Sequence, residues 1–494
     1  MSKKKSIFYS ALMLTAVNLL LRTAGTTFQV YLSGRIGASG IGLLQLVLSV
    51  ASLSMTAGIA GIRTGAMYLT AEELGKKRPG NVTWVLSGSF LYSFICSTVV
   101  ASAVFIFAPA IAESWIGDIQ ATDALRIFAA FMPISCLCGV MTGYFTAANR
   151  ITTLAAVEVA EQVCTITVTM MALHFWAGTD PGRACQAVIF GSSISACMTL
   201  LSLVVLRLRE RAKTGPRIPI AKRLTGIAMP LALADDLRSG ISTLENLMVP
   251  KRLALFQGAA DPLALFGMVC GMVFPILMFP CAILFGLTEL LIPEMARCNA
   301  AGSQGRIRYL MKRSLKLVLM YGTVCAGIEF ILADQLCRGL YRSEQAGYYL
   351  KLFAPLIVML YADIITDAMI KGLGQQKASV RYNILTSSMD VALLFIMLPR
   401  WGMIGYFISF AVTHAINFGL SLNRLVKITG QSPPLRETVL CLLGAACAIF
   451  AAGFVNGSAV KILVFLSIYF AILTIKNVIS KEDYQWIRGL FSTK

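Results

Sequence analysis

Residues 82–108 read VTWVLSGSFLYSFICSTVVASAVFIFA, a run without a charged side chain that is long enough to cross a bilayer as one helix. Similar apolar blocks recur along the whole 494-residue chain and are separated by short polar loops. Apolar residues make up 57% of the chain and charged residues 14%, whereas roughly 25% of the residues of a soluble protein are charged. The pattern predicts a polytopic α-helical membrane protein. It excludes a soluble core of this size and a β-barrel, whose strands alternate apolar and polar residues.

Fourteen blocks are predicted to span the membrane, and the loops between them predict the orientation. With the N-terminus inside, only nine of the 43 Lys and Arg residues fall in outer loops, as the positive-inside rule requires. We therefore expect the protein in the cell membrane, with both of its termini in the cytoplasm. The net charge of +19 then reflects topology and contact with membrane lipids, not nucleic acid. The predicted spans are 6–28, 41–62, 82–108, 124–146, 152–174, 186–206, 224–248, 263–291, 314–334, 348–370, 379–398, 402–423, 437–455 and 459–475.

A weak internal repeat predicts two six-helix lobes related by a parallel repeat, with two further helices at the C-terminal end. Residues 42–46 (GLLQL) and 264–268 (ALFGM) each open a span at an equivalent place in the two halves. The expected organisation is an N-lobe at 1–206, a basic cytoplasmic linker at 207–223, a C-lobe at 224–423, two extra spans within 424–475 and a cytoplasmic tail at 476–494.

Enzyme chemistry has no recognisable signature in this chain. The 13 Cys lie mostly inside apolar spans, and the two His are far apart in the sequence, so neither a disulfide framework nor a metal site is expected. No P-loop, G-x-S-x-G or H-E-x-x-H motif occurs, and the loops are too short for a catalytic domain. We therefore expect a transporter without a cofactor, and not an enzyme.

Polar side chains inside the first span share one helix face. Asn18, Arg22, Thr26 and Gln29 recur at intervals of four, four and three residues. Because polar groups are costly in lipid, this face is expected to line a wet cavity. The alternative is that Arg22 reaches outward from the end of the span to the membrane surface.

The seventh predicted span is the least apolar of the fourteen. Asp235, Arg238 and Glu245 lie on one face of it together with Ser242. Pro230 removes a backbone hydrogen bond, so we expect a kink that serves as a hinge. The alternative for Asp235 and Arg238 is a structural ion pair.

Together these spans predict a basic cavity at mid-membrane. Guanidinium and ammonium groups suit phosphate. The candidate substrate-binding residues are Arg22, Arg35, Arg63, Arg238, Lys251 and Arg252, with Asn18 and Gln29. The candidate coupling acids of the cavity are Asp235, Glu245 and Asp363.

Three segments resemble the stage V sporulation protein B family of the multidrug/oligosaccharidyl-lipid/polysaccharide (MOP) exporter superfamily. They are residues 37–45 (GASGIGLLQ), 249–253 (VPKRL) and 372–383 (GLGQQKASVRYN), the last followed by Asn417 and by residues 420–425 (LSLNRL). The resemblance extends over nearly the whole chain, including the fourteen spans. Gln29 departs from it, because the family tends to carry a basic residue there.

The resemblance implies a flippase of MATE-like fold for undecaprenyl-linked saccharide, with a V-shaped cavity between two lobes and a role in spore cortex peptidoglycan. It also implies a groove for the lipid tail formed by the last two helices. Our first hypothesis is accordingly a lipid-linked saccharide flippase that works by alternating access. The second is an antiporter of the same fold for drugs or metabolites, coupled to H⁺ or Na⁺. The third is a structural membrane partner that recruits a cell-wall synthase and moves nothing.

Overall fold

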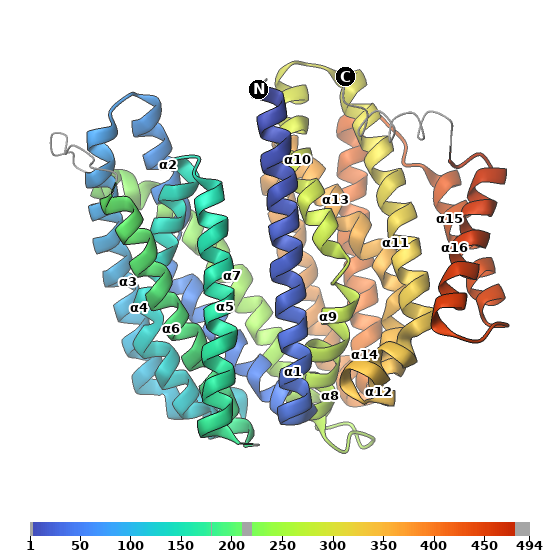
Figure 1. Cartoon of the computed structure of the whole chain (residues 1–494), viewed down its shortest axis with the longest axis horizontal. Helices are drawn as coiled ribbons and strands as arrows, with labels where there is room; N and C mark the ends of the chain where they lie inside the picture. The colour runs from blue at the N-terminus through green and yellow to red at the C-terminus, as the bar shows by residue number, and fades with distance from the viewer. Residues whose placement is uncertain (1–2, 179, 210–219, 480–494) are drawn as a thin grey trace. The chain divides into compact units, whose positions relative to one another are not determined.

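The computed structural model describes the backbone except at residues 1–2, 179, 210–219 and 480–494, and side chains except also at residues 3–15, 177, 221, 230, 231 and 234. The described part of the chain is almost entirely helical and contains no strand (Figure 1). Its helices are α1 (Lys3–Ile59), α2 (Ile62–Gly75), η1 (Pro79–Asn81), α3 (Val82–Ala110), η2 (Ile111–Ile116), α4 (Ala121–Ala147), α5 (Ile151–Ala172), η3 (Leu173–Ala177), α6 (Pro181–Leu208), α7 (Ala221–Leu253), α8 (Pro262–Met268), η4 (Val269–Val273), α9 (Phe274–Leu277), α10 (Cys281–Ala300), α11 (Gln304–Tyr341), α12 (Glu344–Phe353), η5 (Ala354–Leu356), α13 (Ile357–Gly372), α14 (Gln376–Thr429), α15 (Leu435–Ala452) and α16 (Ser458–Ile475).

The predicted spans lie on helices for most of their length. Helix α1 contains 6–28 and most of 41–62, and α14 contains both 379–398 and 402–423, whereas 263–291 is interrupted between α9 and α10. Within the described residues, ten helical segments are long and apolar enough to cross a membrane, or eleven if the bent pair Pro262–Leu277 and Cys281–Ala300 counts as one span. Helix α7 is not among them, since the polar residues expected to line a cavity lower its hydropathy. The chain is therefore a multi-pass membrane protein.

Two glycines divide the longest helices. Gly37 breaks α1 with φ 69° and ψ −178°, and Gly402 breaks α14 with φ 56° and ψ −137°. Both lie in the positive-φ region that only glycine enters at low cost. Each break reverses the chain between two spans without a longer loop.

Three helices begin at side chains that cap them. The carboxylate of Asp180 accepts a hydrogen bond from the backbone N–H of Arg183 at the start of α6. Asp261 caps α8 in the same way, and there the hydroxyl of Ser39 also donates to the carboxylate. Ser343 caps α12. Such caps satisfy backbone donors that a helix start otherwise leaves without partners.

The described chain forms two compact units. Unit 1 comprises Met1–Gly271 and Val391–Met403, and unit 2 comprises Met272–Asp390 and Ile404–Lys494. This division groups α7 with the preceding helices, whereas the sequence repeat assigns it to the second lobe. The repeat-based boundaries stay a prediction, and the middle of the linker (210–219) and most of the tail (480–494) lie outside the described residues.

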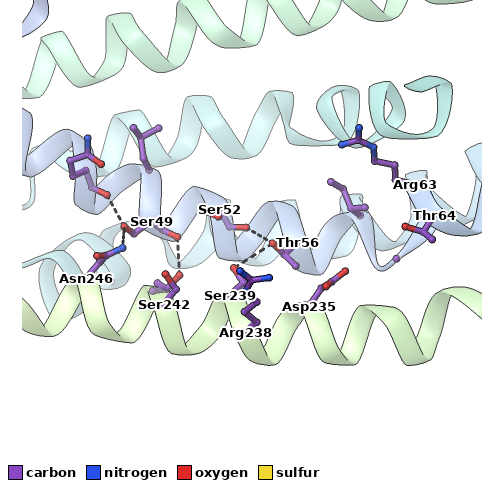
Figure 2. Close-up of a pocket in the computed structure, with 15 residues that line it drawn as sticks. Ser49, Ser52, Thr56, Arg63, Thr64, Asp235, Arg238, Ser239, Ser242 and Asn246 are labelled. Carbon is purple, nitrogen blue, oxygen red and sulfur yellow. Dashed lines mark hydrogen bonds between the residues drawn. The ribbon is translucent and has the colours of Figure 1, made fainter. Parts of the chain in front are cut away.

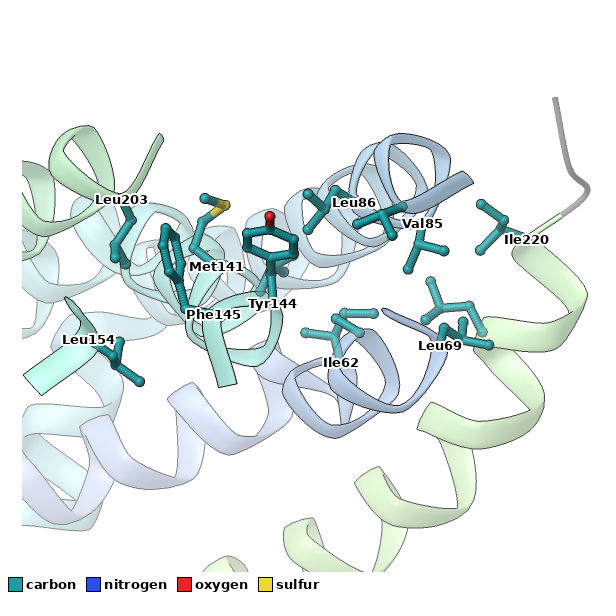
Figure 3. Close-up of a cluster of buried hydrophobic side chains, with 14 residues drawn as sticks. Ile62, Leu69, Val85, Leu86, Met141, Tyr144, Phe145, Leu154, Leu203 and Ile220 are labelled. Atoms are coloured by element: carbon teal, nitrogen blue, oxygen red, sulfur yellow. The ribbon is translucent and has the colours of Figure 1, made fainter. Parts of the chain in front are cut away.

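The core of unit 1 is formed by side chains of the five helices α2, α3, α4, α5 and α6, together with the start of α7 (Figure 3). Phe145 and Leu203 are completely buried, and Leu69 is 1% exposed. Burial of each such side chain contributes on the order of 1.5–3 kcal/mol when the alternative is water. The cluster fixes α2 and the beginning of α7 relative to each other, and these are the helices that carry the site described below.

A separate core in unit 2 attaches the last two helices. Helices α15 and α16 form a hairpin that packs on α11 (Figure 1). Phe465 of α16 lies against Gly327, where a Cβ would leave no room for the ring. The hydroxyl of Tyr469 is hydrogen-bonded to that of Thr323. The predicted extra spans are thus anchored by both apolar contact and a buried polar contact.

Candidate functional site: a polar groove along α7

A cavity of about 550 Å³ lies between α7, the second half of α1 and the start of α2, all in unit 1 (Figure 2). Helix α7 contributes Asp235, Arg238, Ser239, Ser242, Thr243 and Asn246. Helix α1 contributes a matching polar face of Gln45, Ser49, Ser52 and Thr56. Two polar helix faces therefore meet across one groove.

Hydrogen bonds at Ser49 hold the two helices together. The side-chain amide of Asn246 donates to the hydroxyl oxygen of Ser49 at 3.1 Å. The hydroxyl of Thr243 donates to the backbone carbonyl of Ser49 at 3.0 Å. A weaker contact of 3.4 Å joins the hydroxyl groups of Thr56 and Ser239. These contacts fix the spacing of α1 and α7 along the groove.

The junction of α1 and α2 shapes one end of the groove. Ala60 and Gly61 both have positive φ, so the chain bends there. A Cβ on Gly61 would lie 2.3 Å from the carbonyl oxygen of Ala228, which means that α7 approaches the bare backbone at this point. The bend brings Arg63 and Thr64 of α2 into the groove lining.

An ion-pair cluster ties the start of α7 to the end of α2. The guanidinium of Arg223 lies 2.7 Å from Glu72 and 3.3 Å from Glu73. The side chain of Glu73 is only 3% exposed, and the amide of Asn81 donates to it at 2.9 Å. Buried charges need such partners. The cluster therefore sets the position from which α7 enters the groove.

The groove carries two cations and one anion. Arg63, Arg238 and Asp235 have exposed side chains that line it. Among the residues that the structure describes, Asp235 and Arg238 form no ion pair with each other. The charges of Asp235 and Arg238 are therefore available to a ligand within the groove, whereas Arg63 also interacts electrostatically with Glu158.

Of the residues predicted for the cavity, the structure brings Arg63, Asp235 and Arg238 together in this groove. Lys251 and Arg252 lie at the end of α7 and line a second cavity. Glu245 is half-buried on α7 and does not line the groove. Pro230 lies in α7, which is helical through this position, but its side chain is outside the described residues.

The other predicted residues lie elsewhere. Asn18 and Arg22 are half-buried on the first half of α1, and Arg35 is exposed near its break. The amide of Gln29 donates to the carbonyl of Gly271 at 3.1 Å. The binding roles of these residues stay predictions.

Unit 2 contains its own buried polar clusters. The amide of Asn417 donates to Asp363 at 2.9 Å. Asp390 accepts hydrogen bonds from Ser409 at 2.5 Å and from Thr413 at 3.2 Å. Asp367 forms an ion pair with Lys371, one helical turn further on, at 2.6 Å. Within the described part of the chain, no group of three or more His, Cys, Asp or Glu side chains is arranged to hold a metal ion.

The polar face of α1 was not among the sequence-based candidates. Gln45, Ser49, Ser52 and Thr56 recur at intervals of four, three and four residues, the same signal that identified the first and seventh spans. Ser and Thr lower hydropathy only slightly, so this face is easily missed when only ionisable residues are sought.

The chain is similar in sequence to a protein-family model and to two known proteins. The MatE family model matches residues 15–177. Stage V sporulation protein B of Bacillus subtilis is 22% identical over 98% of this chain and 98% of its own length. Sporulation protein YkvU of the same organism is 21% identical over 74% of this chain and 82% of its own length.

Solved structures show the same fold. An inward closed structure of the lipid II flippase MurJ has a TM-score of 0.71, 13% identity, and covers 94% of this chain and 98% of its own. An inward-facing multidrug resistance transporter of the MATE family, in the MOP superfamily, has a TM-score of 0.66 with 16% identity, and covers 85% of this chain and 99% of its own. The expected resemblance to the stage V sporulation protein B family and the expected MATE-like, all-helical membrane fold are confirmed.

Proposed function

We propose that this chain, a multi-pass membrane protein with the fold of MOP-superfamily transporters, is a flippase. Its substrate is a polyprenyl-pyrophosphate-linked saccharide related to peptidoglycan precursors, as used in the spore cortex. The protein moves it from the cytoplasmic to the outer leaflet by alternating access, with both termini in the cytoplasm. The resemblance to stage V sporulation protein B supports this reading. So does the likeness to a lipid II flippase, which covers more of the chain than the MATE transporter does.

The observation that carries the proposal is the chemistry of the groove along α7. Arg63 and Arg238 provide two guanidinium groups against the single carboxylate of Asp235. Guanidinium groups bind phosphate oxygens in a bidentate geometry. The hydroxyl and amide groups of Ser52, Ser242 and Gln45 suit the hydroxyl groups of a saccharide. A groove that is basic on balance favours an anionic headgroup over an organic cation.

The membrane potential supplies a driving force for this reaction. A pyrophosphate carries about two negative charges, and moving them outward from an inside-negative cell gains roughly 4–5 kcal/mol per 100 mV. That energy biases the direction of transport without an ATP-hydrolysing domain.

A cation-coupled antiporter is the second candidate, and the carboxylates favour it. Asp235 lines the groove, and Asp363 is held by Asn417 in unit 2. Either acid can bind H⁺ or Na⁺. Efflux of an organic cation that depends on a cation gradient and is lost in Asp235→Asn or Asp363→Asn supports this candidate over the flippase.

The flippase proposal is tested in vesicles that contain the purified protein and a fluorescent lipid-linked pyrophosphoryl saccharide. We expect Arg63→Ala and Arg238→Ala each to slow translocation roughly tenfold to a hundredfold, because a charged hydrogen bond contributes about 1.5–3 kcal/mol. The matched control is Arg297→Ala, whose side chain is 71% exposed and pairs with Glu294 on α10. Wild-type rates in both groove variants contradict the proposal.

A further inference from the structure

A second cavity of about 640 Å³ lies in unit 1, toward the C-terminal end of α7. Its walls come from α1, η2, α7 and α14, and they are mainly Leu53, Trp115, Leu244, Leu247, Val391 and Phe395. Thr243 lines both this cavity and the polar groove, so the two are neighbours along α7. Its hydroxyl is bonded to Ser49. The second cavity is therefore an apolar space beside a polar one.

Two cations stand at the end of this cavity, and both are fixed to its walls. The guanidinium of Arg252 lies 3.6 Å from the ring centroid of Phe395 and donates to the Phe395 carbonyl at 2.8 and 3.2 Å. The ammonium of Lys251 donates to the carbonyl of Ser114 in η2, next to Trp115. These bonds hold η2, α7 and α14 around the cavity.

The charges at this end are not balanced by acids. Within residues 3–178, 180–209 and 220–479, neither Lys251 nor Arg252 is paired with a carboxylate. Basic residues in the last turn of a helix commonly serve its own carbonyl end, but both side chains here bond to carbonyls of other elements. An apolar cavity that ends in two uncompensated cations complements a lipid with an anionic end.

We propose that this cavity holds a stretch of the polyisoprenyl chain of the transported lipid, with its phosphate at Lys251 and Arg252. This inference rests on the proposed function and adds to it a second binding site for the transported lipid, the outer station. An apolar cavity of about 150 Å³ holds one benzene ring, so about 640 Å³ admits several isoprene units. The cavity is an outer station for the lipid after its headgroup leaves the groove.

The position of the cations along α7 supports two successive stations. Lys251 lies thirteen residues beyond Arg238 on the same helix, which is about 20 Å along the helix axis. The hydrocarbon core of a bilayer is about 30 Å thick. A pyrophosphate that passes from Arg238 to Lys251 thus crosses most of the membrane, and under the predicted topology it ends on the outer side.

The first test fills the cavity and measures binding by native mass spectrometry, using undecaprenyl phosphate as the probe. Leu244 lines the cavity and is 54% exposed; Leu237, also on α7, is 52% exposed and lines neither cavity. We expect Leu244→Trp to weaken binding roughly tenfold, the order of effect for blocking one well-filled apolar contact. Leu237→Trp is the control and should bind like the wild type. Equal binding by the two variants overturns the inference.

The second test removes the charges and identifies the lipid. The double variant Lys251→Gln, Arg252→Gln should lose undecaprenyl phosphate binding while Lys251→Arg retains it. Phosphatidylglycerol, which has the charge without the isoprenoid chain, should fail to displace the probe. Equal displacement by phosphatidylglycerol makes the cavity a phospholipid site and overturns the inference.

These binding tests are separable from the transport test. Undecaprenyl phosphate carries no saccharide, so its binding does not depend on translocation. Normal translocation without binding at this cavity refutes the outer station and leaves the flippase intact. Binding at the cavity without any translocation refutes the flippase and leaves a lipid site.

Discussion

Ser49 uses both of its oxygen atoms to join two helices. Its hydroxyl accepts from Asn246 and its carbonyl from Thr243. Ser49 and Thr243 are both buried, so water competes little for the hydrogen bond between them. At the scale of single residues, the groove thus combines hydrogen-bonded donors and acceptors at Ser49 with two exposed guanidinium groups, those of Arg63 and Arg238.

Thr243→Val removes one of these bonds at nearly constant shape. Thr243 is 4% exposed, and the substitution leaves the Ser49 carbonyl without that donor, so we expect a loss of about 1 kcal/mol of stability. Thermal unfolding in detergent measures it. Thr167→Val is the control, since the Thr167 hydroxyl is exposed and bonds only within its own helix. A Thr243 variant as stable as the Thr167 variant contradicts the role given to this bond.

The charged residues of the groove were predicted from the sequence, whereas its Ser and Thr hydroxyl groups were not. Arg63, Asp235 and Arg238 stood out because ionisable groups are costly in a membrane. Ser49 and Thr56 bond to carbonyls of their own helix, a pattern that any buried Ser or Thr can adopt. Only the partner helix shows that their face belongs to a groove.

At the scale of elements, the Arg223 cluster decides how α7 meets α2. Arg223→Ala leaves the buried carboxylate of Glu73 with Asn81 as its remaining bonded partner. We expect a loss of roughly 1–3 kcal/mol from the charge left behind. Lys76→Ala is the control, because Lys76 pairs with Glu72 on the surface and such pairs contribute at most about 0.5 kcal/mol. Equal stability of the two variants in thermal unfolding argues against the cluster as an anchor.

The break in α1 depends on one glycine. Gly37→Ala places a Cβ where nothing lies within 4 Å, so its cost comes from the backbone alone. We expect a loss of about 1–3 kcal/mol for a side chain at this φ and ψ. Gly34→Ala is the control, since Gly34 is helical and equally free of close neighbours, and it should be neutral or stabilising. Thermal unfolding in detergent compares the two variants. If Gly37→Ala is as stable as Gly34→Ala, the positive φ assigned to Gly37 is contradicted.

The existence of these helices could be predicted, but their breaks could not. Residues 34–42 contain four glycines, and nothing in the sequence distinguishes the one that adopts positive φ. The first helix therefore extends past residue 28, where the predicted span ends, to the break at Gly37. Similarly, the kink expected at Pro230 does not interrupt the helical assignment of α7, and its role as a hinge remains a prediction.

At the scale of the whole molecule, the distribution of Lys and Arg predicts that both termini are cytoplasmic. We expect a cysteine at Gln257, between α7 and α8, to react with a membrane-impermeant maleimide in intact cells. A cysteine at Ser303, between α10 and α11, should react only after permeabilisation. Both positions are exposed. The assay needs a cysteine-free background, because Cys447 is exposed. The reverse labelling pattern contradicts cytoplasmic termini.

The most direct measurement of the central proposal is a cryo-electron microscopy map of the protein with a bound polyprenyl-pyrophosphoryl saccharide. We expect pyrophosphate density within hydrogen-bonding distance of the guanidinium groups of Arg63 and Arg238. A headgroup bound elsewhere, with both guanidinium groups against acyl chains or neutralised by carboxylates, would contradict it.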